Sequence, residues 1–460
     1  MMELKGKKVL VVGLGKSGLA AALFLRHCGA QVTVSDKSSA EALAKDIPAL
    51  LDEGIMVEAG GHGLLTFRRQ DLIVVSPGVP LDTPELVQAK SFGLPIIGEL
   101  ELAARFLKGK TLAITGSNGK TTTTALVGEI LEKAGLPTLV GGNIGVPVVS
   151  LIEGSTDVTW SVLEVSSFQL ESTVEFKPAI AVILNITPDH LDRHGSFENY
   201  IEAKERIFAA QDAQDCLVLN ADNAPAAAAA ARAKSKVYLF SRKHPVAQGA
   251  WVEDGLIVFR SSEDADVEKV MPLNGITLKG DHNVENVLAA VCAARLADAP
   301  AEAVRLAIES FHAVEHRLEY VATINGVEFY NDSKATNVDA TAKAIAAFKS
   351  GIHLILGGKD KGSPYTPLTP LIQERVRAIY TIGVAAAKIE SQLRGVAPIH
   401  SCETLEKAVA AAADAAHPGE VVLLAPACSS YDQFENYEQR GRAFKELVGD
   451  RRGWKEWQKE

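Results

Sequence analysis

Two glycine-rich turns, each between an apolar strand and a helix, constrain the fold of this chain most strongly. The first turn, GLGKSG at residues 13–18, follows the apolar run 8–12, and the second, GSNGKTT at residues 116–122, follows the run 111–115. Glycines permit the tight turn, and exposed N–H groups at the start of the helix bind phosphate. Such strand–turn–helix units build parallel α/β sheets. The chain is therefore predicted to be an α/β protein with two phosphorylated ligands.

The length of 460 residues predicts about three domains, because one hydrophobic core rarely serves more than roughly 250 residues. We place the domains at residues 1–98, 99–310 and 311–460. Strands are expected at 8–13, 31–36, 71–75, 111–115, around Val162, and at 179–184, 353–356, 378–382 and 421–424. Helices are expected at 17–27 and 197–210, and the alanine-rich stretch 224–233 is expected to be one exposed helix. Alternating strands and helices imply parallel pairing.

Composition excludes several classes of protein. The chain is 47% apolar and 23% charged, as in soluble globular proteins, and its net charge of -10 argues against a broad surface for nucleic acid. Its five cysteines form no CxxC pair, so neither a disulfide framework nor a zinc site is expected, and a reducing compartment fits. No apolar run reaches the roughly 18 residues of a membrane span, and Gly13 and Gly15 interrupt the run that a signal peptide would need. We expect a cytoplasmic protein that contacts no membrane.

The first turn leaves two interpretations open. GxGxxG followed by Asp36, at the end of the next strand, is the pattern of a dinucleotide site in which the acid binds a ribose. By itself it favours a nicotinamide-dependent oxidoreductase. The same turn also binds the pyrophosphate of a nucleotide that takes no part in redox chemistry.

The second turn carries more information, because it ends in the Gly-Lys-Thr of a P-loop. Its amides would surround phosphates, Lys120 would reach the β and γ oxygens, and the Thr121 hydroxyl would bind Mg²⁺. Ile114 stands where a strict P-loop has glycine. A dehydrogenase has no use for this second turn, whereas a P-loop switch or motor would use it without any synthetic reaction.

Further along the second domain, several polar residues follow predicted strands. Glu164 lies in an apolar strand, where an unpaired carboxylate is unfavourable, so either a bound cation or a buried Arg or Lys would accompany it. Asp189, His190 and Asp192 follow the next strand, where α/β sheets bind ligands, although an acidic surface turn has the same composition. Lys204, on the helix 197–210, is by its residue type alone a surface lysine.

Three segments of the third domain each follow a predicted strand and are rich in small, hydroxyl or cationic residues. They are NDSKATN at 331–337, GGKDKG at 357–362 and PACSSYDQF at 426–434. Loops at the carboxyl ends of parallel strands meet at one edge of the sheet. The three segments therefore predict a pocket for an anionic substrate.

These motifs resemble those of the Mur ligases, in the same order over essentially the whole chain. The matching segments are GLGKSG, ITGSNGKTT, GGNIG, LEVSSFQLE, NITPDHLDR, GDHNVENVLAA, EHRLE, NDSKATN and PACSSYDQF. The resemblance implies three α/β domains: a Rossmann-like N-terminal domain, a central P-loop ATPase-like parallel sheet and a Rossmann-like C-terminal domain. It implies an ATP-dependent ligase that joins D-glutamate to UDP-N-acetylmuramoyl-L-alanine through an acyl phosphate.

The resemblance also implies roles for individual residues. The UDP-sugar would contact Gly13, Leu14, Ser17, Asp36, Lys37, Ser76, Gly78 and Asn143. ATP would contact Gly116, Ser117, Asn118, Gly119, Lys120, Thr121, Thr122, Asn283, Asn286, Arg317 and Asp332. Mg²⁺ would be held by Thr121, Glu164, His190 and Lys204, the last as a carbamate, and Lys120, Glu164, His190 and Lys204 would be catalytic. D-glutamate would contact Lys334, Thr336, Lys361, Ser430 and Tyr437, where Tyr437 replaces the phenylalanine of the family.

Among related ligases, the folylpolyglutamate synthetases lack the front GxGxxG domain that this chain has. The Mur ligase that adds the third residue carries an Asn-Pro-Arg motif, which is missing from the last domain here. The implied partners are thus three small molecules, UDP-N-acetylmuramoyl-L-alanine, D-glutamate and ATP, and we expect a monomer.

Overall fold

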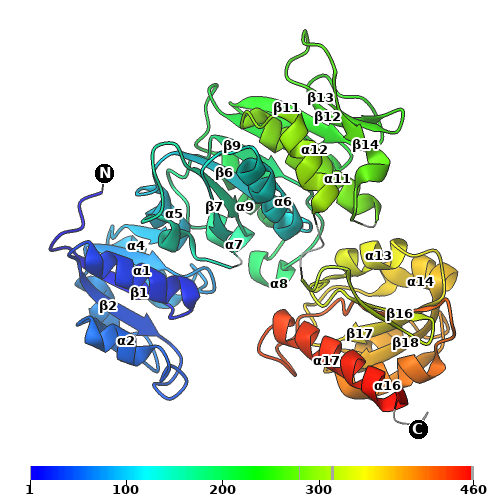
Figure 1. Ribbon diagram of the computed structural model, residues 1–460. Helices are drawn as coiled ribbons and strands as arrows, with labels where there is room; N and C mark the ends of the chain where they lie inside the picture. The colour runs from blue at the N-terminus through cyan, green and yellow to red at the C-terminus, as the bar shows by residue number, and fades with distance from the viewer. Residues whose placement is uncertain (1, 144, 279, 312–314, 457–460) are drawn as a thin grey trace. The chain divides into compact units, whose positions relative to one another are not determined.

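The computed structural model describes residues 2–143, 145–278, 280–311 and 315–456 (Figure 1). Ile144 of the GGNIG motif lies outside the described residues. The chain divides into two compact units. The first comprises Met1–Ile186, Glu198–Gly275 and Glu285–Glu309, and the second comprises Thr187–Phe197, Ile276–Val284 and Ser310–Glu460. In the part of the chain that the structure describes, no helix is long and apolar enough to cross a membrane.

The N-terminal sheet has five parallel strands in the order β3-β2-β1-β4-β5. Its elements are β1 (Lys8–Val12), α1 (Lys16–His27), β2 (Gln31–Asp36), α2 (Ile47–Asp52), β3 (Met56–Ala59), α3 (Leu64–Arg68), β4 (Leu72–Val75), α4 (Pro84–Ser91) and β5 (Ile96–Gly98). The strands predicted at 8–13, 31–36 and 71–75 and the helix predicted at 17–27 are confirmed. The order reverses at β1, between β2 and β4, so the first glycine turn lies at the switch point of the sheet, where such folds bind ligands.

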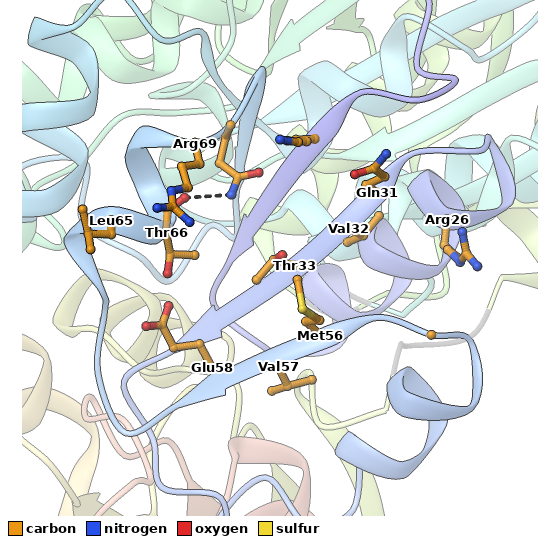
Figure 2. A pocket seen from close by; sticks show the side chains of 13 residues that line it. Arg26, Gln31, Val32, Thr33, Met56, Val57, Glu58, Leu65, Thr66 and Arg69 are labelled. Carbon is orange, nitrogen blue, oxygen red and sulfur yellow. Dashed lines mark hydrogen bonds between the residues drawn. The ribbon is translucent and has the colours of Figure 1, made fainter.

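One face of β2 and β3 is incompletely covered. Figure 2 shows Thr33 and Met56 on neighbouring strands, with α3 residues to one side of them. Helix α3 has only five residues, and Met56 and Leu65 are 67% and 65% exposed. The result is a hollow of about 710 Å³ whose lining includes Lys8, Arg69 and Glu58.

The central sheet has nine strands in the order β14-β13-β12-β11-β10-β9-β6-β8-β7. Pairing is parallel from β7 to β12, and antiparallel for β12–β13 and β13–β14. The strands are β6 (Lys110–Thr115), β7 (Thr138–Gly142), β8 (Trp160–Glu164), β9 (Ile180–Ile183), β10 (Cys216–Asn220), β11 (Lys236–Ser241), β12 (Gly249–Glu253), β13 (Leu256–Arg260) and β14 (Glu268–Pro272). The predicted strands at 111–115, around Val162 and at 179–184 are confirmed.

The helices of this sheet differ from the sequence-based predictions at two places. They are α5 (Glu99–Ala104), α6 (Lys120–Lys133), α7 (Ser167–Leu170), α9 (Phe197–Glu205), α10 (Ala224–Ala228), α11 (Asp281–Leu296) and α12 (Ala301–Ser310). The helix predicted at 197–210 ends at Glu205 and continues as a 3-10 turn, Arg206–Phe208. The stretch 224–233 is not one exposed helix, because α10 gives way to the 3-10 turn Ala229–Arg232 and both Ala226 and Ala229 are buried.

The C-terminal sheet has six strands in the order β15-β16-β20-β17-β18-β19, parallel except for the β15–β16 pair. The strands are β15 (Glu319–Ile324), β16 (Val327–Asn331), β17 (Ile352–Gly357), β18 (Val376–Ile382), β19 (Ile399–Glu403) and β20 (Val421–Leu424). The helices of this unit are α8 (Leu191–His194), α13 (Val338–Ala346), α14 (Thr369–Arg375), α15 (Ala386–Gln392), α16 (Leu405–Ala415) and α17 (Tyr437–Glu456). The predicted Rossmann-like arrangement and the strands at 353–356, 378–382 and 421–424 are confirmed.

Two buried carboxylates of α5 bind the backbone of the central domain. Glu101 accepts hydrogen bonds from the N–H groups of Val174, Glu175 and Phe176, at 2.8 to 3.0 Å. Glu99 accepts one from the N–H of Val149 at 2.8 Å. Burial raises the pKa of Glu99 to about 7, against the backbone hydrogen bonds that act to lower it.

Glu99 is expected to make stability depend on pH. Its folded pKa lies above its unfolded value, so its contribution is complete below the unfolded pKa and is lost as pH rises through about 7. The loss corresponds to roughly 3 kcal/mol. Glu99→Gln removes this titration, so its melting temperature relative to the parent should increase between about pH 5 and pH 8 in thermal scans. A difference that does not change with pH would show that Glu99 is already ionised in the folded protein.

Candidate active site

The first glycine turn is held from two sides. The backbone of Gly13 is left-handed (φ +91), and a Cβ at Gly18 would lie 1.9 Å from the Gly13 carbonyl oxygen, so α1 can pack this closely only with glycine there. The Ser76 hydroxyl donates to that same carbonyl at 2.7 Å. Both sets of contacts leave the N–H groups at the start of α1 at the carboxyl edge of the sheet.

Asp36 connects the turn to the end of β2. Its carboxylate accepts hydrogen bonds from the N–H of Leu14 at 2.6 Å and from the N–H of Ser38 at 2.7 Å. Partial burial acts to raise the pKa of Asp36, but these N–H groups outweigh it and lower the pKa below its usual value. Asp36 is therefore an ionised group that shapes the turn as well as a candidate ligand contact.

The structure brings Gly13, Leu14, Asp36 and Ser76 together, as expected for one ligand site. The remaining residues assigned to it lie close by in the chain, on α1 or directly after β2 and β4: Ser17, Lys37 and Gly78. Asn143 is placed differently, since it follows β7 and its amide donates to Glu164 at 3.1 Å.

In the second turn, side chains donate hydrogen bonds to the carbonyl groups of the turn. Gly119 is left-handed (φ +88) and precedes Lys120, the first residue of α6. The Asn185 side chain accepts from the N–H of Asn118 at 2.9 Å and donates to its carbonyl at 3.1 Å, which fixes the turn against the end of β9. The Lys120 ammonium donates to the carbonyls of Gly116 (2.9 Å) and Ser117 (3.0 Å). Thr122 is buried in the first turn of α6.

Lys204 is buried, so the interpretation as a surface lysine is wrong. It is 1% exposed, and its ammonium donates to the Gly116 carbonyl at 2.8 Å. The ammonium also lies 4.6 Å from the centre of the Tyr200 ring, one turn earlier on α9. The Tyr200 hydroxyl in turn is 3.1 Å from the Ser117 hydroxyl. Sequence reasoning missed Tyr200, although its spacing of four residues from Lys204 places both on one face of the helix.

Glu164 ends β8 beside the same turn. It is 2% exposed; one oxygen accepts from the Thr121 hydroxyl at 2.7 Å and the other from Asn143. Both partners are neutral, so the contacts found here do not support the alternative in which a buried Arg or Lys balances its charge.

The oxygen atoms of Thr121 and Glu164 suit Mg²⁺, which prefers hard oxygen ligands. Within the described ranges, no group of three or more His, Cys, Asp and Glu side chains is close enough to hold a metal. Mg²⁺ is commonly held by one or two carboxylates together with water and substrate phosphates, so this small set fits it.

Asn286 contacts the second turn from α11. A Cβ at Gly119 would lie 2.1 Å from the Asn286 side-chain oxygen, which shows how closely the two residues pack. Asn283 and Asn286 are 3% and 5% exposed. In the sequence these two residues are recognisable only from the HNVEN motif.

In the second unit, the three loops that follow β16, β17 and β20 converge as predicted. Lys359 and Ser429 form an antiparallel bridge, and the N–H of Ala427 donates to the Ala335 carbonyl at 2.9 Å. The Lys361 ammonium lies 3.4 Å from the Thr336 hydroxyl. The adjacent Ser430 is 2% exposed.

Two further assigned residues pack on each other beside these loops. The Lys334 ammonium lies 5.2 Å from the centre of the Tyr437 ring, a cation–π contact. The Ser333 hydroxyl donates to the Tyr437 carbonyl at 2.8 Å, which ties α17 to the loop after β16.

Arg440 is a buried residue that sequence reasoning missed. It is 0% exposed, and its guanidinium donates to the carbonyls of Ser333 (2.8 Å), Cys428 (3.1 Å) and Ser429 (3.3 Å). Burial lowers the pKa of Arg440 to about 10, so it remains charged at neutral pH. The sequence offers no signal for it, because an arginine on a charged helix is usually exposed.

Asp189 belongs to the same unit and is not part of an acidic surface turn. It is 6% exposed, accepts from the Asn337 amide at 2.9 Å and lies 3.7 Å from the Lys361 ammonium. Asp189 also accepts from the N–H of His190 at 2.9 Å, and His190 has a left-handed backbone (φ 52). Asp192, by contrast, is exposed.

Asp332 and Arg317, the two assigned nucleotide contacts of this unit, interact through their charges. Burial raises the pKa of Asp332 to about 6, and Arg317 acts in the opposite direction. Asp332 is 4% exposed. A carboxyl group with such a pKa is sensitive to the arrival of further charge.

Comparisons with known proteins agree with this geometry. Three families match in order: the Mur ligase MurD-like N-terminal domain at residues 7–98, the Mur ligase middle domain at 114–294, and the Mur ligase glutamate ligase domain at 316–428. The chain is 71% identical over 457 residues to a UDP-N-acetylmuramoylalanine–D-glutamate ligase of Acidobacterium capsulatum, covering 99% of each chain. It is 60% identical to the ligase of the same name from Koribacter versatilis, covering 97% of this chain and 98% of the relative.

A solved structure shows the same fold at lower identity. UDP-N-acetylmuramate–alanine ligase of Thermotoga maritima is 21% identical, with a TM-score of 0.61, covering 96% of this chain and 99% of that one.

The second turn yields a direct prediction. Lys120→Ala removes the point charge that would face a transferring phosphoryl group, and such a loss lowers turnover by about 100-fold or more. We expect phosphate release from ATP at saturating ATP to fall by that amount, while the melting temperature changes little because the turn lies at the sheet edge. Turnover within about tenfold of the parent would contradict the assignment of Lys120.

Proposed function

The chain belongs to the Mur ligase family, and on this premise we infer that it joins D-glutamate to UDP-N-acetylmuramoyl-L-alanine at the expense of ATP. It is an ATP-dependent ligase of peptidoglycan precursor synthesis. The observation that carries this conclusion is 71% identity, over 99% of the chain, to a ligase of that name. The two phosphate-binding turns on separate sheets agree with it, since one serves a nucleotide-linked sugar and the other a triphosphate.

Family membership also decides between the earlier alternatives. A nicotinamide oxidoreductase would leave the second turn unused, and a P-loop switch would leave the loops of the C-terminal sheet unused. Both interpretations are wrong. The GxGxxG turn holds a nucleotide without redox chemistry.

The reaction needs activation of a carboxylate. The carboxylate of the alanyl group attacks the γ-phosphorus of ATP, the bond to the β-γ bridging oxygen breaks, and ADP leaves. The D-glutamate amine then attacks the acyl phosphate; the amide forms, inorganic phosphate departs with the electron pair of the C–O bond, and the amine proton passes to solvent. The first step brings anions together, so the charge of Lys120 at the P-loop lowers its barrier.

We assign the nucleotide-sugar to the first turn through Gly13, Leu14, Ser17, Asp36, Lys37, Ser76 and Gly78, together with Asn143. For ATP, the geometry of Lys120, Thr121 and Asn118 supports a phosphate site, and Asn286 borders it. Mg²⁺, when bound, would neutralise phosphate charge. Thr121 and Glu164 supply oxygen atoms for it, and His190 and a carbamate on Lys204 are further proposed ligands.

We assign D-glutamate to the loops of the C-terminal sheet. Lys334, Lys361, Thr336 and Ser430 are cationic or hydroxyl side chains suited to two carboxylates, and Tyr437 positions Lys334 through its ring. The enzyme is proposed to act in the cytoplasm, where its soluble substrates are available, and to act as a monomer.

Amino-acid selectivity tests the proposed function. With ATP, Mg²⁺ and UDP-N-acetylmuramoyl-L-alanine, phosphate release should be rapid with D-glutamate and at least about 100-fold slower with L-glutamate or D-aspartate, because each leaves a carboxylate or its partner unpaired. Equal release with the L-isomer, or release without any amino acid, would refute it.

Lys204 provides a second test. If it acts as a carbamate anion, Lys204→Ala should lose at least about 100-fold of activity, and acetate at constant ionic strength should partly restore it by supplying carboxylate oxygens. Lys204→Arg should not be rescued, since it keeps a cation there. The nitrogen of a carbamate keeps one N–H, so the hydrogen bond from Lys204 to the Gly116 carbonyl is compatible with the carbamate form. Parental activity of Lys204→Ala without acetate would exclude the carbamate role.

A further inference from the structure

We propose that Asp360 is a positioning residue of the amino-acid site: its carboxylate, held by Lys388 and Tyr365, fixes the loop that carries Lys361. The proposal rests on the proposed function, because it assigns Lys361 to the substrate. It adds residues that neither the family motifs nor the assigned contacts include.

Asp360 is the centre of a small network within the C-terminal unit. One carboxylate oxygen accepts from the Tyr365 hydroxyl at 2.9 Å and the other from the Lys388 ammonium at 2.7 Å. The same ammonium donates to the Ser363 carbonyl at 3.1 Å. Lys388 lies on α15, so this helix holds the loop at both Asp360 and Ser363.

The charges of the network are well defined. Partial burial acts to raise the pKa of Asp360, but Lys388 and the Tyr365 hydroxyl outweigh it and lower the pKa, so the carboxylate is ionised. Burial and the neighbouring acidic groups raise the pKa of Tyr365, which therefore remains a neutral donor. Lys388 also lies 5.4 Å from the centre of the Tyr365 ring, a cation–π contact.

The ends of the loop are anchored independently of Asp360. At the start, the N–H of Lys359 donates to the Ser429 carbonyl at 2.9 Å. At the end, the N–H of Tyr365 donates to the side chain of Gln392 at 2.7 Å, and Tyr365 is 1% exposed. Asp360 and Lys388 thus determine the path of the backbone between two fixed points.

Lys361 is the residue whose position depends on this path. Its ammonium contacts Thr336 and Asp189, whereas the side chain of its neighbour Asp360 contacts α15. A lysine side chain has four rotatable bonds, so its ammonium is placed accurately only when its backbone is fixed. A displacement of about 1 Å of a charged substrate contact is enough to lower binding substantially.

The network contributes little to stability, so substitutions in it can be tested without unfolding the protein. The side chains of Lys388 and Asp360 are 34% and 29% exposed, and partly exposed ion pairs add little to stability. Asp360→Ala and Lys388→Met should fold normally. Tyr365→Phe removes only the hydroxyl from a buried ring. Tyr380→Phe is the matched control, because Tyr380 is equally buried and its hydroxyl contacts His353 at 3.0 Å, away from the substrate loops.

The experiment measures kcat, the KM for D-glutamate and the KM for ATP in each variant. We expect Asp360→Ala to raise the KM for D-glutamate about tenfold or more, the loss expected for a hydrogen-bonded charge, with the KM for ATP within about twofold of the parent. Lys388→Met and Tyr365→Phe should raise it by smaller factors, and Tyr380→Phe should not raise it.

A double-mutant comparison separates positioning from a general structural effect. Because Lys388 and Tyr365 share the Asp360 carboxylate, either substitution should raise the KM for D-glutamate by a smaller factor in Asp360→Ala than in the parent, since only the contacts with Ser363 and Cys428 are then left to lose. An unchanged KM in Asp360→Ala, or equal increases in the KM for ATP, would overturn the proposal. A parent enzyme that releases no phosphate with D-glutamate would instead overturn the proposed function.

Discussion

The carbonyl oxygen of Gly116 is the acceptor around which the second glycine turn is arranged. Two ammonium groups, those of Lys120 and Lys204, donate to it at 2.9 and 2.8 Å. The two lysines come from different helices, α6 and α9, and like charges repel unless an acceptor or an anion lies between them. One carbonyl thus holds both ammonium groups beside the second glycine turn. The neighbouring Glu164 accepts a hydrogen bond from Thr121 of the same turn.

The C-terminal unit also brings charged side chains together, through the loops that follow its strands. Its parallel strands end at one edge, and a backbone bridge joins two of the loops that follow them, so cationic and hydroxyl side chains from distant parts of the sequence lie close together. Ion pairs such as Lys361–Asp189 connect these loops to the segment that contains His190. In both units, the geometry of a parallel sheet brings charged side chains of separate loops together.

The sequence predicted the sheets and the turns well, because strand periodicity, glycine spacing and P-loop chemistry are local properties. It predicted little about burial. Lys204, Asp189 and Arg440 are charged residues whose types favour exposure, and only packing against other segments buries them. The prediction for the alanine-rich stretch was wrong for a similar reason, since alanine favours a helix but does not indicate which residues are buried. The motif resemblance placed Lys204 and His190 in a functional site, whereas Tyr200 and Arg440 needed the three-dimensional contacts.

Arg440 connects the C-terminal helix to two loops. Its guanidinium, on α17, donates to backbone carbonyls of the loops after β16 and β20, and the carbonyl of Tyr437, on the same helix, accepts from the Ser333 hydroxyl. A shift of either loop would break contacts with this helix, and unwinding of the helix at its start would remove contacts with both loops. The start of the C-terminal helix thus holds the loops after β16 and β20 together. Residues added after this helix would therefore leave these contacts in place, whereas a chain that ends before residue 437 would lack them.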